Sequence, residues 1–120
     1  MSFIGKMFRL TAGKADAKRD ANLVAPEDVT AIYDVSYAGN KDSYNLLDVY
    51  YPKDTQGLLP VIVSIHGGGY VYGTKEIYKF YGMYLAQQGF TFVNFNYHLA
   101  PDVKFPTQLM ETNMVLEWMV

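Results

Sequence analysis

Three adjacent glycines are the part of the sequence whose residue types point most directly to chemistry. They stand in His66-Gly67-Gly68-Gly69-Tyr70, directly after the nearly continuous apolar run from Leu59 to Ile65. Glycine has no Cβ, so its backbone reaches left-handed angles and a ligand can approach its amide closely. Exposed N–H groups can stabilise the charge that develops on a carbonyl oxygen during acyl transfer. An oxyanion hole at Gly68 and Gly69 is one interpretation, and a tight turn that only joins strand to helix is another.

Two phosphate-binding templates fit the same glycines less well. A P-loop needs GxxxxGK[ST], and although Gly68 and Gly73 have the required spacing, Thr74-Lys75 follows in the reverse order. A dinucleotide fingerprint needs GxGxxG, and Tyr72 occupies the place of its third glycine, where a side chain would hold helix and strand apart. Both templates are therefore disfavoured.

The remaining nucleophiles and ligands give no catalytic constellation. None of the four serines stands in the G-x-S-x-G motif of a serine nucleophile, and the chain has no cysteine. No carboxylate or second histidine stands at ligand spacing around His66, so we expect no metal and no cofactor. His98 is expected to hydrogen-bond at a chain corner. The aspartates without paired spacing are expected to be solvated or in turns: Asp42, Asp48, Asp54 and Asp102.

The elements that must position the glycine loop follow an α/β order. Two β-branched and aromatic runs flank turn-forming residues and predict an antiparallel hairpin, after which strand and helix alternate. The helices are expected to bury apolar residues spaced three and four apart. The predicted strands are 30–37, 45–51, 59–65 and 91–97, the helices are 75–88 and a final one after Pro106, and the expected apolar faces are Ile77, Phe80, Tyr81, Tyr84 and Leu85, and Leu109, Val115, Leu116 and Met119.

The first 28 residues differ in composition from the rest. Residues 1–10 have the pattern of a short amphipathic arm, and residues 11–22 are rich in Ala, Lys and Asp, which indicates a solvated helix or a mobile lead-in. We therefore predict an N-terminal arm or cap segment over residues 1–28 and the main domain over residues 29–120. In that domain, Leu59 to Ile65 is typical of a strand covered on both faces.

Two motifs together resemble one enzyme family. His66-Gly67-Gly68-Gly69-Tyr70, followed by Asn96-Tyr97-His98-Leu99-Ala100-Pro101-Asp102, Phe105-Pro106 and Glu111, is similar to the hormone-sensitive-lipase-like branch of the α/β-hydrolases. The resemblance implies the N-terminal part of an α/β-hydrolase fold, with an antiparallel hairpin leading into a parallel sheet with flanking helices. The family pattern has Asp-Tyr-Arg where this chain has Asn96-Tyr97-His98, which puts an ion pair at that corner in doubt.

The resemblance also implies a function and a set of site residues. It implies a serine carboxylesterase acting on short acyl esters, with Gly68 and Gly69 donating to the oxyanion. His66 and Gly67 would then structure the loop, and Tyr70 and Tyr72 would lie near the substrate pocket. The serine, acid and histidine of the triad are expected beyond Val120, so these 120 residues alone are expected to be inactive. A non-catalytic truncated α/β module or interaction subunit is the alternative.

Composition limits the partners. Half of the 120 residues are apolar, and 12 acidic against 10 basic side chains give a net charge of −2. Without a basic cluster there is no electrostatic case for nucleic acid, and no apolar run is long enough to span a membrane. The charges among residues 1–10 make a poor secretory signal, so a cytoplasmic location is expected. Because the apolar strand 61–65 lacks partners, we expect the chain to need a complementary C-terminal portion or self-association for stability.

Overall fold

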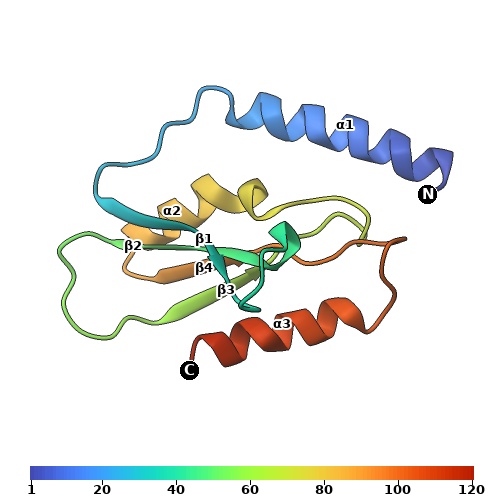
Figure 1. Ribbon diagram of the computed structural model, residues 1–120. Coiled ribbons are helices and arrows are strands. Elements are labelled where there is room, and N and C mark those ends of the chain that lie inside the picture. Colours follow the sequence, from blue (N-terminus) through green and yellow to red (C-terminus); the bar gives the residue numbers. More distant parts are fainter.

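The computed structural model describes residues 1–120 as a four-stranded sheet with helices on both faces (Figure 1). The sheet order is β1-β2-β4-β3. β1 pairs antiparallel with β2, β2 pairs antiparallel with β4, and only β3 and β4 are parallel. In chain order the elements are α1 (Phe3–Asp20), β1 (Val29–Ser36), η1 (Ser43–Asn45), β2 (Leu46–Pro52), β3 (Val61–Ile65), η2 (Lys75–Tyr78), α2 (Lys79–Gln87), β4 (Thr91–Phe95) and α3 (Thr107–Trp118).

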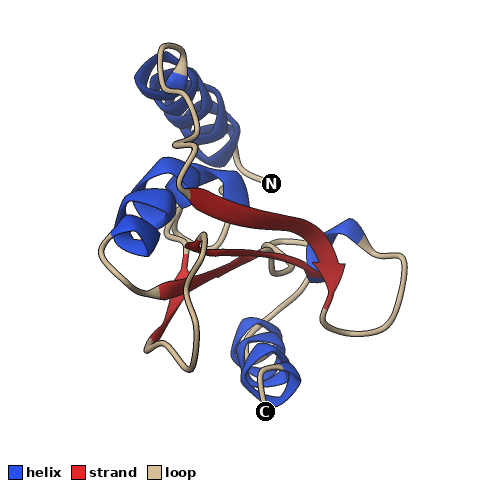
Figure 2. Cartoon of the chain, turned by 90° about the vertical axis from the view of Figure 1, so that its left-hand side faces the viewer, coloured by secondary structure: helices blue, strands red, loops and turns tan.

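The predicted hairpin is confirmed, and the two core clusters follow from the alternation of side chains along its strands. Successive residues of a strand point to opposite faces of a sheet. On β4, Val93 and Phe95 therefore pack on the α3 side with Leu47, while Phe92 packs on the α2 side with Tyr50. Figure 2 shows α2 and α3 on opposite faces of the sheet, with α1 beyond α2. The sheet is thus the shared wall of two cores.

The predicted apolar face of α2 is partly wrong: Phe80 and Leu85 pack against the core as expected, but the two tyrosines do not. Tyr81 and Tyr84 are more than half exposed, and the buried residues of the helix are Gly82, Met83 and Ala86. The reason is the closeness of the helix to the sheet: a Cβ on Gly82 would lie 2.4 Å from the Phe92 ring. Only small or flexible side chains fit on that face, so the tyrosines turn toward solvent.

The predicted face of α3 is also partly wrong. Val115 is fully buried, but Leu109 and Leu116 are exposed, and the second buried residue of α3 is Glu111. The polar partners of Glu111, described below, orient the helix together with Val115. At the sheet edge, β3 has one neighbour only, and Val61 and Ile65 are about half exposed. The expectation that this strand is covered on both faces is therefore not met by residues 1–120.

At the N-terminus, α1 is one helix from Phe3 to Asp20 and not a short arm followed by a separate segment. It buries no residue. Its contacts with the domain run along its length and are mostly polar: the Arg9 guanidinium donates to the carbonyls of Val71 and Ala100, and the Arg19 guanidinium donates to the carbonyl of Ile77 at 2.6 Å. The Phe8 ring adds one aromatic contact, to Tyr72. The helix thus lies across the segments that follow β3 and β4.

The expectation that Asp48 is solvated is wrong. Asp48 is buried in β2, and its carboxylate contacts the buried Lys75 ammonium at 2.9 Å. The same ammonium contacts Asp34 at 2.9 Å and Glu76 at 2.7 Å. A charge in the interior is tolerated only when it is paired and hydrogen-bonded. This cluster attaches η2, the first turn after the glycine loop, to the middle of the sheet.

No helix of the chain is both long and apolar enough to cross a membrane.

Candidate active site

The glycine loop, residues 66–73, leaves the C-terminal end of β3 and turns back within a few residues. The carbonyl of Gly68 accepts from the amides of Val71 and Tyr72, both at 3.1 Å. Gly68, Gly69 and Gly73 have φ values of 129°, 60° and 118°. A Cβ on Gly68 would lie 1.9 Å from the carbonyl oxygen of Tyr72. The path of the main chain therefore requires glycine at these three positions.

His66 holds the start of this loop. Its side chain is buried and stacks on Tyr97 with ring centroids 4.2 Å apart, and the Tyr97 hydroxyl donates to the His66 carbonyl at 2.5 Å. Burial lowers the pKa of His66, so the ring is neutral and its Nδ1 donates to the Gly67 carbonyl at 2.8 Å. A Cβ on Gly73 would lie 2.4 Å from that Nδ1 atom, so the loop closes directly on the imidazole. Its Nε2 atom is buried without a partner in the chain.

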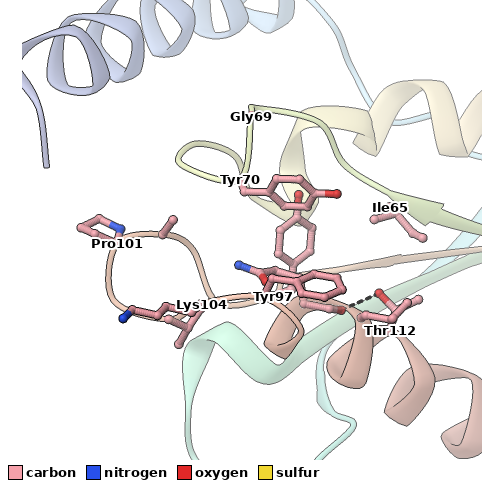
Figure 3. Close-up of a pocket in the computed structure, with 12 residues that line it drawn as sticks. Ile65, Gly69, Tyr70, Tyr97, Pro101, Lys104 and Thr112 are labelled. Atoms are coloured by element: carbon pink, nitrogen blue, oxygen red, sulfur yellow. Dashed lines mark hydrogen bonds between the residues drawn. The ribbon is translucent and has the colours of Figure 1, made fainter.

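Three consecutive amides of the loop are free. The N–H groups of Gly68, Gly69 and Tyr70 donate to no acceptor in the chain. Gly69 and Tyr70 line a cavity of about 630 Å³. In Figure 3, Gly69 and Tyr70 lie on one side of this cavity, and Lys104 and Thr112 lie on the other. A polar ligand atom in the cavity could therefore meet unpaired backbone donors.

The cavity wall comes from four parts of the chain. They are the end of β3, the glycine loop, the segment after β4, and the first half of α3. Most of the wall is apolar or aromatic, and Lys104 is its single charged residue. The lining residues are Ile65, Gly69, Tyr70, Tyr97, Ala100, Pro101, Val103, Lys104, Phe105, Gln108, Leu109 and Thr112. Such a wall suits an apolar ligand with a few polar groups.

Of the two tyrosines expected near the substrate, only Tyr70 lines the cavity. Tyr72 instead faces α1, where its hydroxyl donates to Asp16 and its ring meets Phe8 edge to face, with centroids 5.9 Å apart. The positive φ of Tyr70, 62°, and the hydrogen bonds from the Val71 and Tyr72 amides to Gly68 turn the chain between the two tyrosines, so their side chains leave on different sides. Tyr72 is therefore an anchor for the N-terminal helix in this structure.

The sequence did not identify most of the wall. Tyr97 and Ala100 belong to the motif after β4, so the motif could have indicated them. Leu109, predicted to lie on the buried face of its helix, lines the cavity instead. Ile65, Gln108 and Thr112 carry no signal, because only the folding of α3 across the end of β3 brings them together. Position in the fold, not residue type, selects these three.

His98 is a hydrogen-bonding corner residue, as expected, but its partners were not foreseen. Its Nδ1 atom lies 2.8 Å from Glu111 Oε2, and its Nε2 atom lies 2.9 Å from Asp42 Oδ2. The structure therefore has an ion pair at this corner, although histidine stands where the family pattern has arginine. Asp42 also caps η1 by accepting from the Tyr44 amide at 2.9 Å.

This fold, with a glycine loop of unpaired amides at the end of a parallel strand, is that of the α/β-hydrolases. Solved esterases of this class superimpose on nearly the whole chain. Esterase B from Lactobacillus rhamnosis gives a TM-score of 0.90 at 30% identity, with 96% of this chain and 37% of the esterase covered. A bacterial heroin esterase gives a TM-score of 0.75 at 26% identity, with 92% and 35% covered.

Within that class, the BD-FAE family model matches residues 47–120, and the chain belongs to this family. Among curated relatives, versiconal hemiacetal acetate esterase of Dothistroma septosporum is 31% identical over 71 residues, which are 58% of this chain and 22% of the relative. Esterase LipC of Mycobacterium tuberculosis is 29% identical over 79 residues, 64% of this chain and 20% of the relative. The chain therefore spans about a fifth of the length of these relatives.

Proposed function

We propose that these 120 residues supply the oxyanion hole of a serine carboxylesterase that hydrolyses short acyl esters. The single observation that carries the proposal is the pair of consecutive unpaired amides at Gly68 and Gly69, of which Gly69 lines an apolar cavity. The carbonyl oxygen of an ester becomes an oxyanion when a nucleophile attacks its carbon. Each pre-aimed donor to that oxygen lowers the barrier by roughly 2.7–4 kcal/mol.

Each loop residue has a distinct part in this proposal. Gly68 and Gly69 donate their N–H groups, and their positive φ angles expose these groups without a side chain. His66 and Gly67 fix the start of the loop through the bond between the imidazole and the Gly67 carbonyl. Tyr70 contributes to the wall for the acyl or alcohol group. Ester and water give acid and alcohol, with no metal or cofactor in the scheme.

The nucleophile, acid and base are proposed to follow Val120 in a longer protein. In support of this proposal, the chain covers only 37% of esterase B. The proposal is also supported by the open edge of β3, beside which a further parallel strand would bring a nucleophile next to the loop. The same edge supports the proposal that the chain needs a complementary portion or self-association for stability. A cytoplasmic location remains a prediction from sequence.

A hybrid enzyme tests the proposal. Residues 1–120 replace the matching segment of esterase B, and hydrolysis of 4-nitrophenyl butyrate is measured. Gly69 is then replaced by glycolic acid, which exchanges the N–H for an ester oxygen and leaves the φ of the loop unstrained. We expect kcat to fall about 100-fold to 1,000-fold with KM little changed.

Two comparisons complete this experiment. The same replacement at Gly67, where a Cβ would meet nothing within 4 Å, is the control and should change kcat far less. The 120-residue chain alone should not hydrolyse the ester above the buffer rate. An active isolated chain, or a folded hybrid indifferent to the change at Gly69, would contradict the proposed role and favour a non-catalytic module.

A further inference from the structure

A second group of charges lies behind the cavity wall, around His98. The imidazole stands between two carboxylates from distant parts of the chain: Nδ1 is 2.8 Å from Glu111 of α3, and Nε2 is 2.9 Å from Asp42 before η1. The backbone amide of His98 also donates to Glu111, at 3.1 Å. The corner after β4, the turn of the hairpin and α3 therefore meet at one ring.

Both side-chain contacts require a protonated ring. Carboxylates only accept hydrogen bonds, and an imidazole carries N–H on both nitrogens only when it is charged. A neutral ring would turn one lone pair toward a carboxylate oxygen. Removal of one proton thus changes an attraction into a repulsion at either Glu111 or Asp42.

No other charged group competes at this ring. The aromatic ring of Tyr44 covers the imidazole with centroids 4.9 Å apart, and the Tyr37 hydroxyl meets Glu111 at 3.4 Å. Burial raises the pKa of Tyr37, so its hydroxyl stays neutral. Asn45 donates to the same Glu111 carboxylate and is neutral as well. The groups facing His98 from the hairpin and from α3 are therefore two carboxylates and neutral polar or aromatic groups.

The position of the ring links it to the cavity. Tyr97, directly before His98, and Ala100, two residues after it, line the cavity. On α3, Gln108 and Thr112 line the cavity on either side of Glu111 along the chain. The ion pair between His98 and Glu111 therefore fixes two parts of the wall to each other.

We propose that His98 is a positioning residue that works as a titratable clamp: its charged ring holds the corner 97–106 and the start of α3 together, and its deprotonation on the alkaline side loosens this part of the cavity wall. This proposal rests on the geometry of the corner and holds whether or not the protein is an esterase. In the related family pattern an arginine stands at this position, and arginine remains charged at every pH that the fold survives. Histidine makes the same clamp responsive to pH.

The direction of the pH effect follows from the environment of the ring. Burial disfavours the charged form, but hydrogen bonds and charges from Glu111 and Asp42 outweigh it and raise the pKa of His98 above its ordinary value. A raised pKa means that the clamp contributes fully below the unfolded value of about 6.5 and is lost as pH rises through the folded value. The wall should therefore be tight at pH 6 and looser in alkaline solution.

Amide hydrogen exchange, corrected for the intrinsic pH dependence, tests the proposal on the full 120-residue chain. Between pH 6 and pH 9, protection of amides in residues 98–118 should fall by about tenfold per pH unit between the unfolded and folded pKa values, and amides of β2 should keep their relative protection. The NMR signals of the two imidazoles report the titration directly, and His66 serves as the internal reference.

Three variants separate a titrating clamp from a merely structural residue. His98→Arg should keep high protection at both pH values, and His98→Gln should show low protection at both. Asp42→Asn, which retains the Glu111 contact, should shift the midpoint of the change to lower pH and covers the case in which a His98 variant does not fold. A His98 ring that titrates at or below pH 6.5, or protection that falls equally in His98→Arg, would overturn the proposal.

Discussion

The segments that follow β3 and β4 leave the sheet at the same end, but different kinds of interaction hold them in place. The glycine loop follows β3 and the corner 97–106 follows β4, and these two strands are parallel. Main-chain geometry fixes the loop, with three glycines at positive φ. Charged side chains fix the corner, with His98 between Asp42 and Glu111. The loop leaves its amides available for a ligand, whereas the corner uses its polar groups to join segments of the fold.

The two histidines make the contrast concrete. His66 is buried against an aromatic ring, its pKa is lowered by that burial, and its imidazole hydrogen-bonds only to the neighbouring carbonyl. His98 is partly exposed and its pKa is raised by two carboxylates. The same residue type thus has opposite charge behaviour at neighbouring strand ends. We therefore expect added side-chain atoms to destabilise the loop, and loss of charged groups to destabilise the corner.

The largest effect is expected where a Cβ is added to the loop. Gly68→Ala should destabilise the chain by roughly 3 kcal/mol, because the new atom would meet the Tyr72 carbonyl and the residue would have to keep a φ of 129°. Urea unfolding followed by far-UV circular dichroism measures the change. A cost near zero would mean that the loop is not fixed by its main chain.

A smaller loss of stability is expected when the carboxylate acceptor at the corner is removed. Glu111→Gln should cost about 2–3 kcal/mol, because an amide cannot accept from both the ring and the amide of His98 while also serving Asn45. Glu117→Gln, at an exposed position on the same helix, is the matched control and should change stability by less than about 0.5 kcal/mol. Equal costs at the two positions would remove the distinction between corner and surface.

The two histidines should limit stability on opposite sides of neutral pH. The lowered pKa of His66 makes protonation oppose folding, so its contribution is lost as pH falls below about 6.5. The raised pKa of His98 has the reverse sign, so its contribution is lost as pH rises above that value. The unfolding temperature, measured from pH 5 to pH 9, should fall on both the acid and the alkaline side. His98→Gln should remove the alkaline decrease alone. Loss of the decrease at low pH in that variant would contradict its attribution to His66.

The smallest effect is expected at the first glycine of the loop. A Cβ on Gly67 would meet nothing within 4 Å, and this glycine does not have a positive φ. Gly67→Ala should therefore change the free energy of unfolding by less than about 0.5 kcal/mol. Measured beside Gly68→Ala, it shows whether the loop depends on glycine at specific positions or on its overall flexibility.

Local patterns in the sequence were sufficient for the hairpin and for the presence of each later element. The runs 30–37 and 45–51 correspond closely to β1 and β2, because turn residues between two β-branched segments determine this pairing over a short distance. The order of the sheet could not be obtained in this way. β4 lies between β2 and β3 although β3 precedes it in the chain, and only long-range packing sets this arrangement.

The site was predictable where the main chain forms it and not where side chains from distant segments meet. The glycines indicated free amides, because a run of glycines has no side chains and contributes only its backbone conformations. The helix faces were misjudged because hydrophobicity ranks tyrosine above glycine, whereas contact with Phe92 requires glycine at residue 82. Glu111 belonged to a motif after β4, but nothing in its spacing revealed Asp42 as the second partner of His98.

The N-terminal helix has a further consequence for how the molecule comes apart. Because α1 buries no residue and is attached through Arg9, Arg19 and Tyr72, its release exposes little apolar area and costs little of the free energy that holds the sheet. Residues 21–28, which connect it to β1, are mostly exposed. Limited proteolysis should therefore cut there first and leave a resistant core that begins near β1, and the arm over residues 1–28 would behave as a detachable unit.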